Sequence, residues 1–340
     1  MSSSPRILAL TGGDPAGIGP EVVLRALARG AAGGARPVVI IERSALEGAL
    51  RLVPELGPES FVEVDAATRA GLESLAPEQI GLIDPVGRRR TVCAGESGPE
   101  DAAAALAAVD VAIDLARRGL ADAIVTAPVS KASIARHVRP GFVGHTEHLA
   151  AAFGLERYGR DYLMAVLAPE LQVALLSVHL PLRAAIEALT TEGVAEALRC
   201  LERHAGGRIA VAGLNPHAGE DGLLGGEEET ILAPAIAQAR GEGIAVVGPE
   251  SPDSLFARQR RGEFDWTLAL YHDQGLIAVK TAAFGAATNW TLGLPVVRTS
   301  VDHGTAFALA GTGRADAAPM SGAISTAMAL LDGTLPRRAG

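Results

Sequence analysis

Short apolar runs recur along the chain and alternate with longer stretches whose composition is typical of helices. Runs of this length, bounded by glycine, proline and polar residues, indicate buried β-strands. The predicted strands cover residues 7–10, 37–41, 123–126, 162–168, 171–178, 208–214, 244–247, 266–270 and 294–299. The predicted helices cover residues 21–29, 102–119, 191–204 and 226–240. This alternation predicts an α/β fold with largely parallel sheets, in which residues 162–178 form a hairpin.

Length and composition narrow the class of protein. The 340 residues suggest two domains, and 48% hydrophobic with 20% charged residues is typical of a globular enzyme. The net charge of −9, with Arg88–Arg90 as the longest basic run, argues against nucleic acid as a partner. Cys93 and Cys200 lie far apart and predict reduced thiols in a cytoplasmic protein. The sequence shows no signal peptide and no apolar run of membrane-spanning length, so we expect no membrane partner.

A glycine-rich turn, residues 11–20, joins the first predicted strand to the first predicted helix. Its glycines fit neither G-x-G-x-x-G nor G-x-x-x-x-G-K-S/T, which excludes the classical Rossmann fingerprint and the P-loop. Two interpretations stay open: a tight structural turn, or a ligand loop in which Asp14 and backbone N–H groups face the bound molecule.

Three histidines each lie at or just after the end of a predicted strand: His179, His217 and His272. Carboxyl ends of parallel strands meet at one edge of a sheet, where ligands usually bind. Three imidazoles that converge there would suit Zn, Co or Ni, whereas Mg would require more oxygen ligands. Asp253 and Asp273 would then orient the imidazoles. For each histidine alone, a structural polar residue is the competing interpretation.

Other polar groups suit an anionic ligand. His145 and Thr146 belong to the run Gly144-His-Thr-Glu-His148, for which an H-x-x-H metal pair and a helix start capped by Thr146 are alternatives. Lys280, Asn289 and Arg298 form a spaced set of hydrogen-bond donors. The loop at residues 303–311 combines His303 with glycines and small residues, which is typical of a site for a flat ligand or of a simple turn.

Taken together, these segments resemble the 4-hydroxythreonine-4-phosphate dehydrogenase family of pyridoxal phosphate biosynthesis. The matching segments are GDPAGIGPE at 13–21, GHTE at 144–147, HLPLR at 179–183, GLNPHAGE at 213–220, YHDQG at 271–275 and TLGLPVVRTSVDHGTAF at 291–307. The resemblance implies two α/β/α domains of the isocitrate/isopropylmalate dehydrogenase-like type, with a cleft between them. By analogy with that fold, residues 1–135 and 296–340 would form one domain and residues 136–295 the other, with the dimer interface.

The resemblance also implies roles for single residues. The metal ligands would be His179, His217 and His272, with His272 supplied across the interface of a homodimer. The substrate-binding residues would be His145, Thr146, Lys280, Asn289 and Arg298. The dinucleotide, NAD or NADP, would contact Gly13, Asp14, His303, Gly304 and Thr305. His145, Asp273 and Lys280 are the candidates for catalysis, and the general base is left open between an imidazole and Asp273.

The reaction implied is NAD-dependent oxidation of 4-phosphooxy-L-threonine, assisted by one divalent metal (Zn, Co or Mg), with decarboxylation to 3-amino-2-oxopropyl phosphate. A related subgroup oxidises 4-phospho-D-threonate or 4-phospho-D-erythronate, which share the phosphate and the oxidised hydroxyl. A third hypothesis is a catalytically inactive protein that binds a phosphorylated metabolite. Trp290 and Ser254 depart from residues common in the family, but neither is a predicted ligand.

Overall fold

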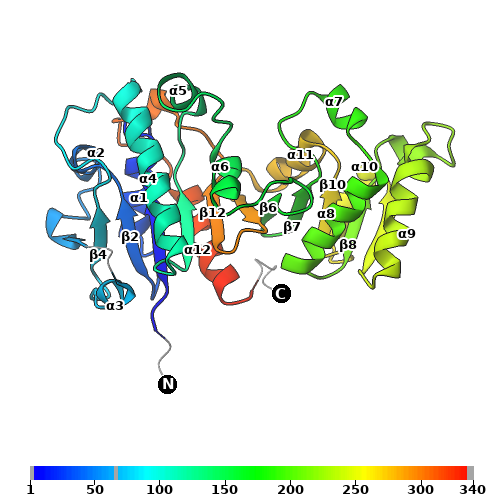
Figure 1. The fold of residues 1–340 in the computed structure, drawn as a ribbon, viewed down its shortest axis with the longest axis horizontal. Coiled ribbons are helices and arrows are strands. Elements are labelled where there is room, and N and C mark those ends of the chain that lie inside the picture. Colours follow the sequence, from blue (N-terminus) through cyan, green and yellow to red (C-terminus); the bar gives the residue numbers. More distant parts are fainter. Residues whose placement is uncertain (1–3, 65–67, 335–340) are drawn as a thin grey trace. The chain divides into compact units, whose positions relative to one another are not determined.

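The chain divides into two compact units in the computed structural model, which describes residues 4–64 and 68–334. Unit 1 contains the described residues up to Phe153 and those from Pro295 onward, and unit 2 runs from Gly154 to Leu294. Figure 1 labels the elements of both units. The sequence places the first boundary after residue 135, whereas the structure places it after Phe153. The reason is that the segment after residue 135 stays packed in unit 1, where Ile134 and Phe142 share an apolar cluster with Ala102 and Leu106.

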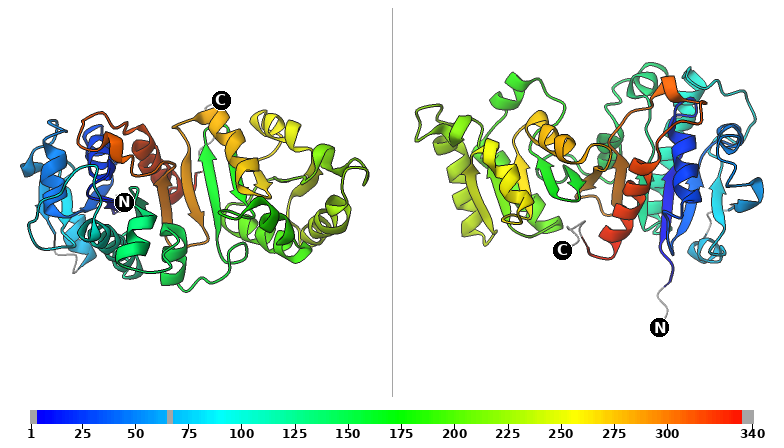
Figure 2. Two further views of the ribbon diagram at one scale, coloured as in Figure 1. Left: turned by 90° about the horizontal axis from the view of Figure 1, so that it is seen from above. Right: turned by 180° about the vertical axis from the view of Figure 1, so that it is seen from behind.

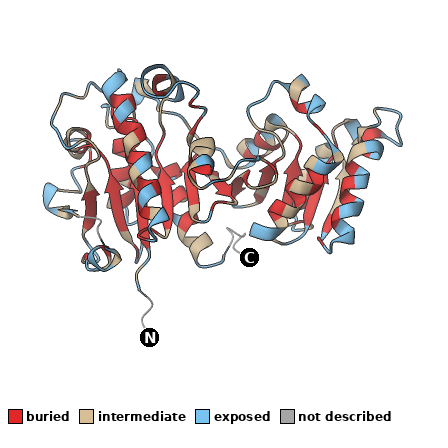
Figure 3. Cartoon of the chain, in the orientation of Figure 1, coloured by how far each residue is buried: buried red, intermediate tan, exposed pale blue. Residues whose placement is uncertain are grey.

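Unit 1 is built on a sheet of parallel strands, in the order β3-β4-β2-β1-β5-β12. The strands are β1 (Ile7–Thr11), β2 (Arg36–Ile40), β3 (Phe61–Glu63), β4 (Ile80–Ile83), β5 (Ala123–Thr126) and β12 (Val297–Val301). The central strands are buried on both faces, which is why they appear in the sequence as continuous apolar runs rather than alternating ones. Figure 3 shows these strands buried, with the exposed residues on the outer faces of the helices.

Helices cover both faces of the unit 1 sheet. They are α1 (Gly19–Ala28), α2 (Arg43–Leu50), α3 (Arg69–Glu73), α4 (Pro99–Arg117), α5 (Lys131–His137), α6 (His145–Ala152) and α12 (Ala318–Leu331). In Figure 2, α1 and α12 lie on one face, while α4, α5 and α6 lie on the other. Two short 3₁₀ turns, η1 (Pro58–Ser60) and η4 (Phe307–Leu309), complete the unit.

Unit 2 has a mixed sheet in the order β11-β6-β7-β10-β8-β9. Its strands are β6 (Leu163–Ala168), β7 (Leu171–Leu175), β8 (Ile209–Ala212), β9 (Val246–Glu250), β10 (Trp266–Ala269) and β11 (Thr288–Leu292). The predicted hairpin is confirmed, because β6 and β7 pair antiparallel. The strands β7, β10, β8 and β9 run parallel, so their carboxyl ends reach the same edge.

The helices of unit 2 also flank their sheet. They are α7 (Leu182–Glu187), α8 (Thr191–His204), α9 (Ala233–Gly241), α10 (Pro252–Arg260) and α11 (His272–Ala283), with a 3₁₀ turn η2 (Pro216–Gly219) and a π-turn η3 (Glu228–Leu232). Helix α11 lies very close to β7, because a Cβ on Gly275 would come within 2.8 Å of Val173 and Leu175. Gly275 therefore serves close packing of helix on sheet.

Several sequence-based boundaries were wrong in informative ways. Residues 272–275, which follow the predicted strand at 266–270 and were assigned to no predicted helix, form the first turn of α11. The predicted helix at 226–240 is divided into η3 and α9, and the predicted strand at 294–299 begins only at Val297. Strand β11 was not predicted. Thr146 does not cap a helix, because α6 begins at His145 with Gly144 in the cap position. No helix in the described ranges is long and apolar enough to cross a bilayer.

Candidate functional site

Two of the three predicted metal-binding histidines lie side by side in unit 2. His179 follows β7 and His272 is the first residue of α11, and their ring centroids are 5.7 Å apart. The Nδ1 atom of His272 is 2.7 Å from Oδ1 of Asp273. Since a carboxylate only accepts, Nδ1 carries the proton and Nε2 keeps the lone pair that a metal would use. Both histidines and Asp273 line a hollow of about 220 Å³.

The third histidine, His217, lies on a backbone turn of unusual conformation after β8. Six successive residues, 217–222, have positive φ, and four of them are not glycine: His217 (50°), Ala218 (52°), Glu220 (46°) and Asp221 (53°). Left-handed backbone costs a residue with a side chain roughly 1–2 kcal/mol. The surrounding structure must therefore hold this turn in place. Nδ1 of His217 is 4.0 Å from Oδ2 of Asp253, the carboxylate predicted to orient it.

The donor chemistry of these residues fits a divalent cation such as Zn or Co. His179 and His272 offer two imidazoles, and Asp273 fixes the orientation of one of them. Within the described part of a single chain, no group of three or more His, Cys, Asp or Glu side chains is placed to hold a metal ion. The convergence of all three histidines on one cation stays a prediction.

Lys280 lies two turns after His272 on the same helix. Together with His272 and Asp273 it lines a second, more open hollow of about 470 Å³. The helix thus presents an imidazole, a carboxylate and an ammonium along one side. Asn289 lies on β11, opposite Val166 of β6, and is partly buried.

In unit 1, a buried guanidinium and a neutral imidazole come together. Arg298 of β12 is buried and donates from Nη2 to Oγ1 of Thr126 (2.7 Å) and from Nη1 to Oγ1 of Thr146 (3.4 Å). Burial lowers the pKa of Arg298 to about 10, so it remains charged at neutral pH. Burial, together with the charges of Arg298 and Lys131, holds the pKa of His145 well below its usual value.

The Nε2 atom of His145 is buried and makes no hydrogen bond to any described residue. Buried polar atoms are almost always paired, so Nε2 is available to a bound ligand or an ordered water. His145, Thr146 and Arg298, predicted to bind substrate from two separate segments, therefore form one group in unit 1. A neutral imidazole beside a fixed positive charge can donate or accept one hydrogen bond while the guanidinium binds an anion.

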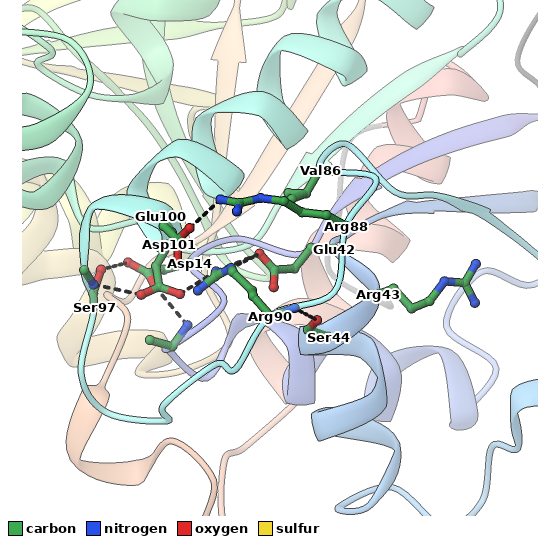
Figure 4. Close-up of polar contacts among 12 residues, drawn as sticks. Asp14, Glu42, Arg43, Ser44, Val86, Arg88, Arg90, Ser97, Glu100 and Asp101 are labelled. Carbon is green, nitrogen blue, oxygen red and sulfur yellow. Dashed lines mark hydrogen bonds and ion pairs between the residues drawn. The ribbon is translucent and has the colours of Figure 1, made fainter.

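Asp14 is fully buried in the glycine-rich turn. Its Oδ2 accepts from Oγ of Ser97 (2.8 Å) and its Oδ1 accepts from the N–H of Ala16 (3.0 Å). Burial raises the pKa of Asp14, and the hydrogen bond from Ser97 opposes that rise. Figure 4 shows Asp14 and Ser97 facing each other. In this position Asp14 fixes the shape of the glycine-rich turn, and its contact with a dinucleotide stays a prediction.

A second buried cluster lies close by in the same view. Arg90 donates to Oε2 of Glu42 (2.7 Å) and to Oδ1 of Asp101 (2.6 Å), and all three side chains are almost inaccessible to water (Figure 4). Burial raises the pKa of Glu42, while the guanidinium of Arg90 opposes that rise. The cluster anchors the loop before α4 to the start of α2. Sequence reasoning missed Arg90, which is part of the only basic run that it noted.

The two loops predicted to hold the dinucleotide contact each other in unit 1. The N–H of Ile18 donates to the carbonyl of Thr305 (3.0 Å), and a Cβ on Gly17 would come within 3.0 Å of that same oxygen. Nε2 of His303 is buried and lacks a partner among the residues described. Gly17 and Gly311 from these loops line a pocket of about 720 Å³. A pocket of this size with glycines in its wall fits a flat ligand such as adenosine, although His303 is not among the residues that line it.

Sequence reasoning also missed several residues that complete these groups. Thr126, at the end of β5, binds the guanidinium of Arg298, and Lys131 lies near His145. Each follows a strand end, which was the only signal that could have found them. The structure is therefore an α/β protein of two units, with an imidazole pair at strand ends in unit 2 and a buried guanidinium beside a neutral imidazole in unit 1.

Comparison with known proteins identifies the family. The family model described as pyridoxal phosphate biosynthetic protein PdxA matches residues 34–327. A 4-hydroxythreonine-4-phosphate dehydrogenase of Aromatoleum aromaticum is 42% identical over 97% of this chain and 98% of its own length. A D-threonate 4-phosphate dehydrogenase of Salmonella typhimurium is 40% identical over 96% of this chain and 99% of its own length.

Solved structures agree with this result. The crystal structure of a 4-hydroxythreonine-4-phosphate dehydrogenase from Klebsiella pneumoniae matches 96% of this chain and 100% of that chain, at 36% identity and a TM-score of 0.85. The chain belongs to the PdxA family, and the resemblance seen in its sequence is confirmed. The curated relatives are named as dehydrogenases, so the family is one of oxidoreductases.

Proposed function

We propose that this protein oxidises 4-phosphooxy-L-threonine with NAD in the presence of a divalent metal, and that the product loses CO2 to give 3-amino-2-oxopropyl phosphate. The balance is simple: the carbinol carbon transfers a hydride to NAD, its hydroxyl loses a proton, and the β-keto acid then releases CO2. The observation that carries the proposal is the contact between His179 and His272, with Asp273 fixing the tautomer of the second ring.

The metal would be held by His179 and His272, with His217 as the third predicted ligand. When bound, a divalent metal supplies Lewis acidity that favours loss of the hydroxyl proton and stabilises negative charge on oxygen. The protein's own contribution is to orient the imidazoles, as Asp273 does for His272 through its Nδ1 atom. Lys280, on the same side of α11, would pair with an anionic group of the substrate.

The group in unit 1 has chemistry that suits a phosphorylated hydroxy acid. Arg298 carries a fixed positive charge that suits a phosphate or carboxylate, and Thr146 keeps its side chain beside that charge. His145 remains neutral at neutral pH, which lets Nε2 make one directed hydrogen bond to a substrate oxygen. Asn289 of unit 2 is proposed as a further contact. NAD or NADP would lie against the loops that contain Gly17 and Gly311, beside Gly13, His303, Gly304 and Thr305.

We further propose that the protein works as a cytoplasmic homodimer. Large apolar side chains next to the imidazole pair are exposed in the single chain: Leu180, Leu182, Ile186, Ile277 (66%) and Phe284 (87%). Exposed apolar groups of this number around a polar site are typical of a surface covered by another chain. A second copy would cover them and would bring its own histidine to the site.

One alternative substrate has specific support. The Salmonella typhimurium relative named D-threonate 4-phosphate dehydrogenase is nearly as similar as the relatives named for 4-hydroxythreonine phosphate. The two proposed activities are separated by measuring the rate of NADH formation with the same metal and NAD. The substrates to compare are 4-phosphooxy-L-threonine, 4-phospho-D-threonate and 4-phospho-D-erythronate. Clear preference for the first supports our proposal, and clear preference for either sugar acid overturns it. No NADH from any of them would favour an inactive binding protein.

A further inference from the structure

The three histidine-bearing segments of unit 2 begin at the ends of three neighbouring strands. His179 follows β7, His272 follows β10 and His217 follows β8, and the sheet order places β10 between the other two. Strand pairing alone fixes the strands. It does not fix the loops beyond them, and the histidines lie in those loops.

A single amide side chain joins two of these loops. Gln274, in the first turn of α11, accepts at Oε1 from the N–H of Leu270 (2.7 Å) and donates from Nε2 to the carbonyl of Gly213 (2.7 Å). Leu270 lies two residues before His272, and Gly213 begins the loop that leads to His217. The third loop is attached to the same point, because Oγ of Ser177 donates to the carbonyl of Leu270 (2.9 Å).

The far side of the His217 loop is held by a buried carboxylate. Oε1 of Glu228 accepts from the N–H groups of Leu214 and Asn215 (both 2.7 Å), and Oε2 accepts from Nδ2 of Asn215 (2.8 Å). A Cβ on Gly219 would lie 2.9 Å from Oε2 of Glu228, so the carboxylate fills the inside of the left-handed turn. The loop is therefore fixed against η3 on one side and against Gln274 on the other.

We propose that Gln274 is a positioning residue that holds the loops bearing His217 and His272 in place within each chain, and thereby sets the affinity for the metal, whichever copy of the chain supplies each histidine. This inference rests on the metal site of the proposed function. The N–H of Leu270 needs an acceptor and the carbonyl of Gly213 needs a donor. The side-chain amide of Gln274 supplies both at the end of one side chain. A glutamate would keep the acceptor for Leu270 but would place an oxygen against the carbonyl of Gly213. A methionine would fill the space and make neither bond.

The test is a titration of the purified full-length protein with Co²⁺ in the absence of substrate and NAD. Binding is followed by calorimetry and by the visible absorption of the bound cobalt, which reports its coordination directly. We expect Gln274→Glu and Gln274→Met to weaken cobalt binding by about 10- to 100-fold, the usual effect of losing groups that orient metal ligands. Ser177→Ala, which removes only the attachment of the third loop, should weaken it by a smaller factor.

Gln259 provides a matched control in the same unit. It too joins backbone segments through its amide, donating to the carbonyls of Gln172 (2.8 Å) and Asp265 (3.2 Å), and its Oε1 accepts from Thr267 (2.8 Å). None of these groups belongs to a histidine-bearing loop. Gln259→Glu should lower the urea midpoint of unfolding and leave cobalt affinity and its spectrum unchanged.

The outcomes separate this inference from the function on which it rests. If the unaltered protein binds no cobalt, the metal site of the proposed function is wrong and the role of Gln274 falls with it. If the unaltered protein binds cobalt and both Gln274 variants bind it equally well, with the same spectrum, only the role of Gln274 is wrong. If Gln259→Glu lost as much cobalt affinity as Gln274→Glu, the loss would be a general effect of destabilisation. That result would also overturn the proposed role of Gln274.

Discussion

The positive charge of Arg298 helps to keep the neighbouring imidazole of His145 neutral. The two residues come from β12 and α6, far apart in the sequence, and burial lowers the pKa of both. A buried neutral imidazole and a buried guanidinium can coexist only because the first does not protonate. This relationship makes predictions about both residues.

The first prediction concerns the pH dependence of stability. The pKa of His145 is lower in the folded protein than its ordinary value of 6.5, so the unfolded chain takes up the proton first. Stability should therefore fall as pH decreases below about 6.5, by at most about 1.4 kcal/mol per pH unit from this group. Urea unfolding measures the free energy of unfolding at each pH. Between pH 7 and pH 5 this free energy should decrease less for His145→Gln than for the unaltered protein. His137 is exposed, so His137→Asn is the control. If His137→Asn changed the slope of unfolding free energy against pH as much as His145→Gln does, the lowered pKa of His145 would not be the cause.

The second prediction concerns anion binding by Arg298. Arg298→Met should raise the KM for the phosphorylated substrate about 10- to 100-fold, because charge-assisted hydrogen bonds contribute roughly 1.5–3 kcal/mol. Arg298→Lys keeps the charge but loses the geometry that holds Thr126 and Thr146, and should recover only part of the binding. Steady-state kinetics at fixed NAD measure this. An unchanged KM in Arg298→Met would remove Arg298 from the substrate site.

The third prediction concerns the buried cluster around Arg90. Arg90→Met leaves the carboxylates of Glu42 and Asp101 buried without their counter-ion and should destabilise the protein by about 3–5 kcal/mol. Without Arg90 the pKa of Glu42 should rise further, because no counter-ion then stabilises the charged carboxylate. The stability difference between Arg90→Met and the unaltered protein should therefore become smaller as pH decreases and Glu42 takes up a proton. Denaturant unfolding measures both effects. Arg118→Met, which breaks an exposed pair with Asp114, should change stability by no more than about 1 kcal/mol.

The fourth prediction concerns the left-handed turn that contains His217. Gly219→Ala would place a Cβ 2.9 Å from the carboxylate of Glu228 at a residue with φ of 85°. We expect a loss of roughly 1–3 kcal/mol in stability and weaker metal binding. Gly241→Ala, at the end of α9 with open space around it, is the matched control. Equal effects of the two substitutions would show that the turn is not under strain.

Strand ends were the part of the site that the sequence could reveal. Parallel strands bring their carboxyl ends to one edge, which was enough to predict that His179 and His272 lie together. The first turn of α11 was not predicted, because Tyr271 is not a typical helix cap and glycine at position 275 is unfavourable inside a helix. Only the sheet beneath explains Gly275, since helix and strand approach too closely for a side chain.

The shape of the His217 loop could not be predicted from its residues. Non-glycine residues rarely adopt positive φ, and what stabilises His217 and Ala218 in that region is a carboxylate ten or more residues later, Glu228. The burial of Asp14 was missed for a similar reason. An aspartate in a glycine-rich turn is compatible with ligand binding or with a structural role, and its partner Ser97 lies far along the chain. Both cases depend on tertiary partners, which local patterns do not contain.

Dependence of turnover on the metal tests the central claim most directly. NADH formation from 4-phosphooxy-L-threonine should be measured before and after removal of divalent metal with a chelator, and again after Zn²⁺ or Co²⁺ is restored. The account predicts that turnover is lost on chelation and returns with the metal, and that the fully folded His217→Ala protein stays inactive throughout. Undiminished turnover after complete chelation, or an active His217→Ala protein, would contradict it.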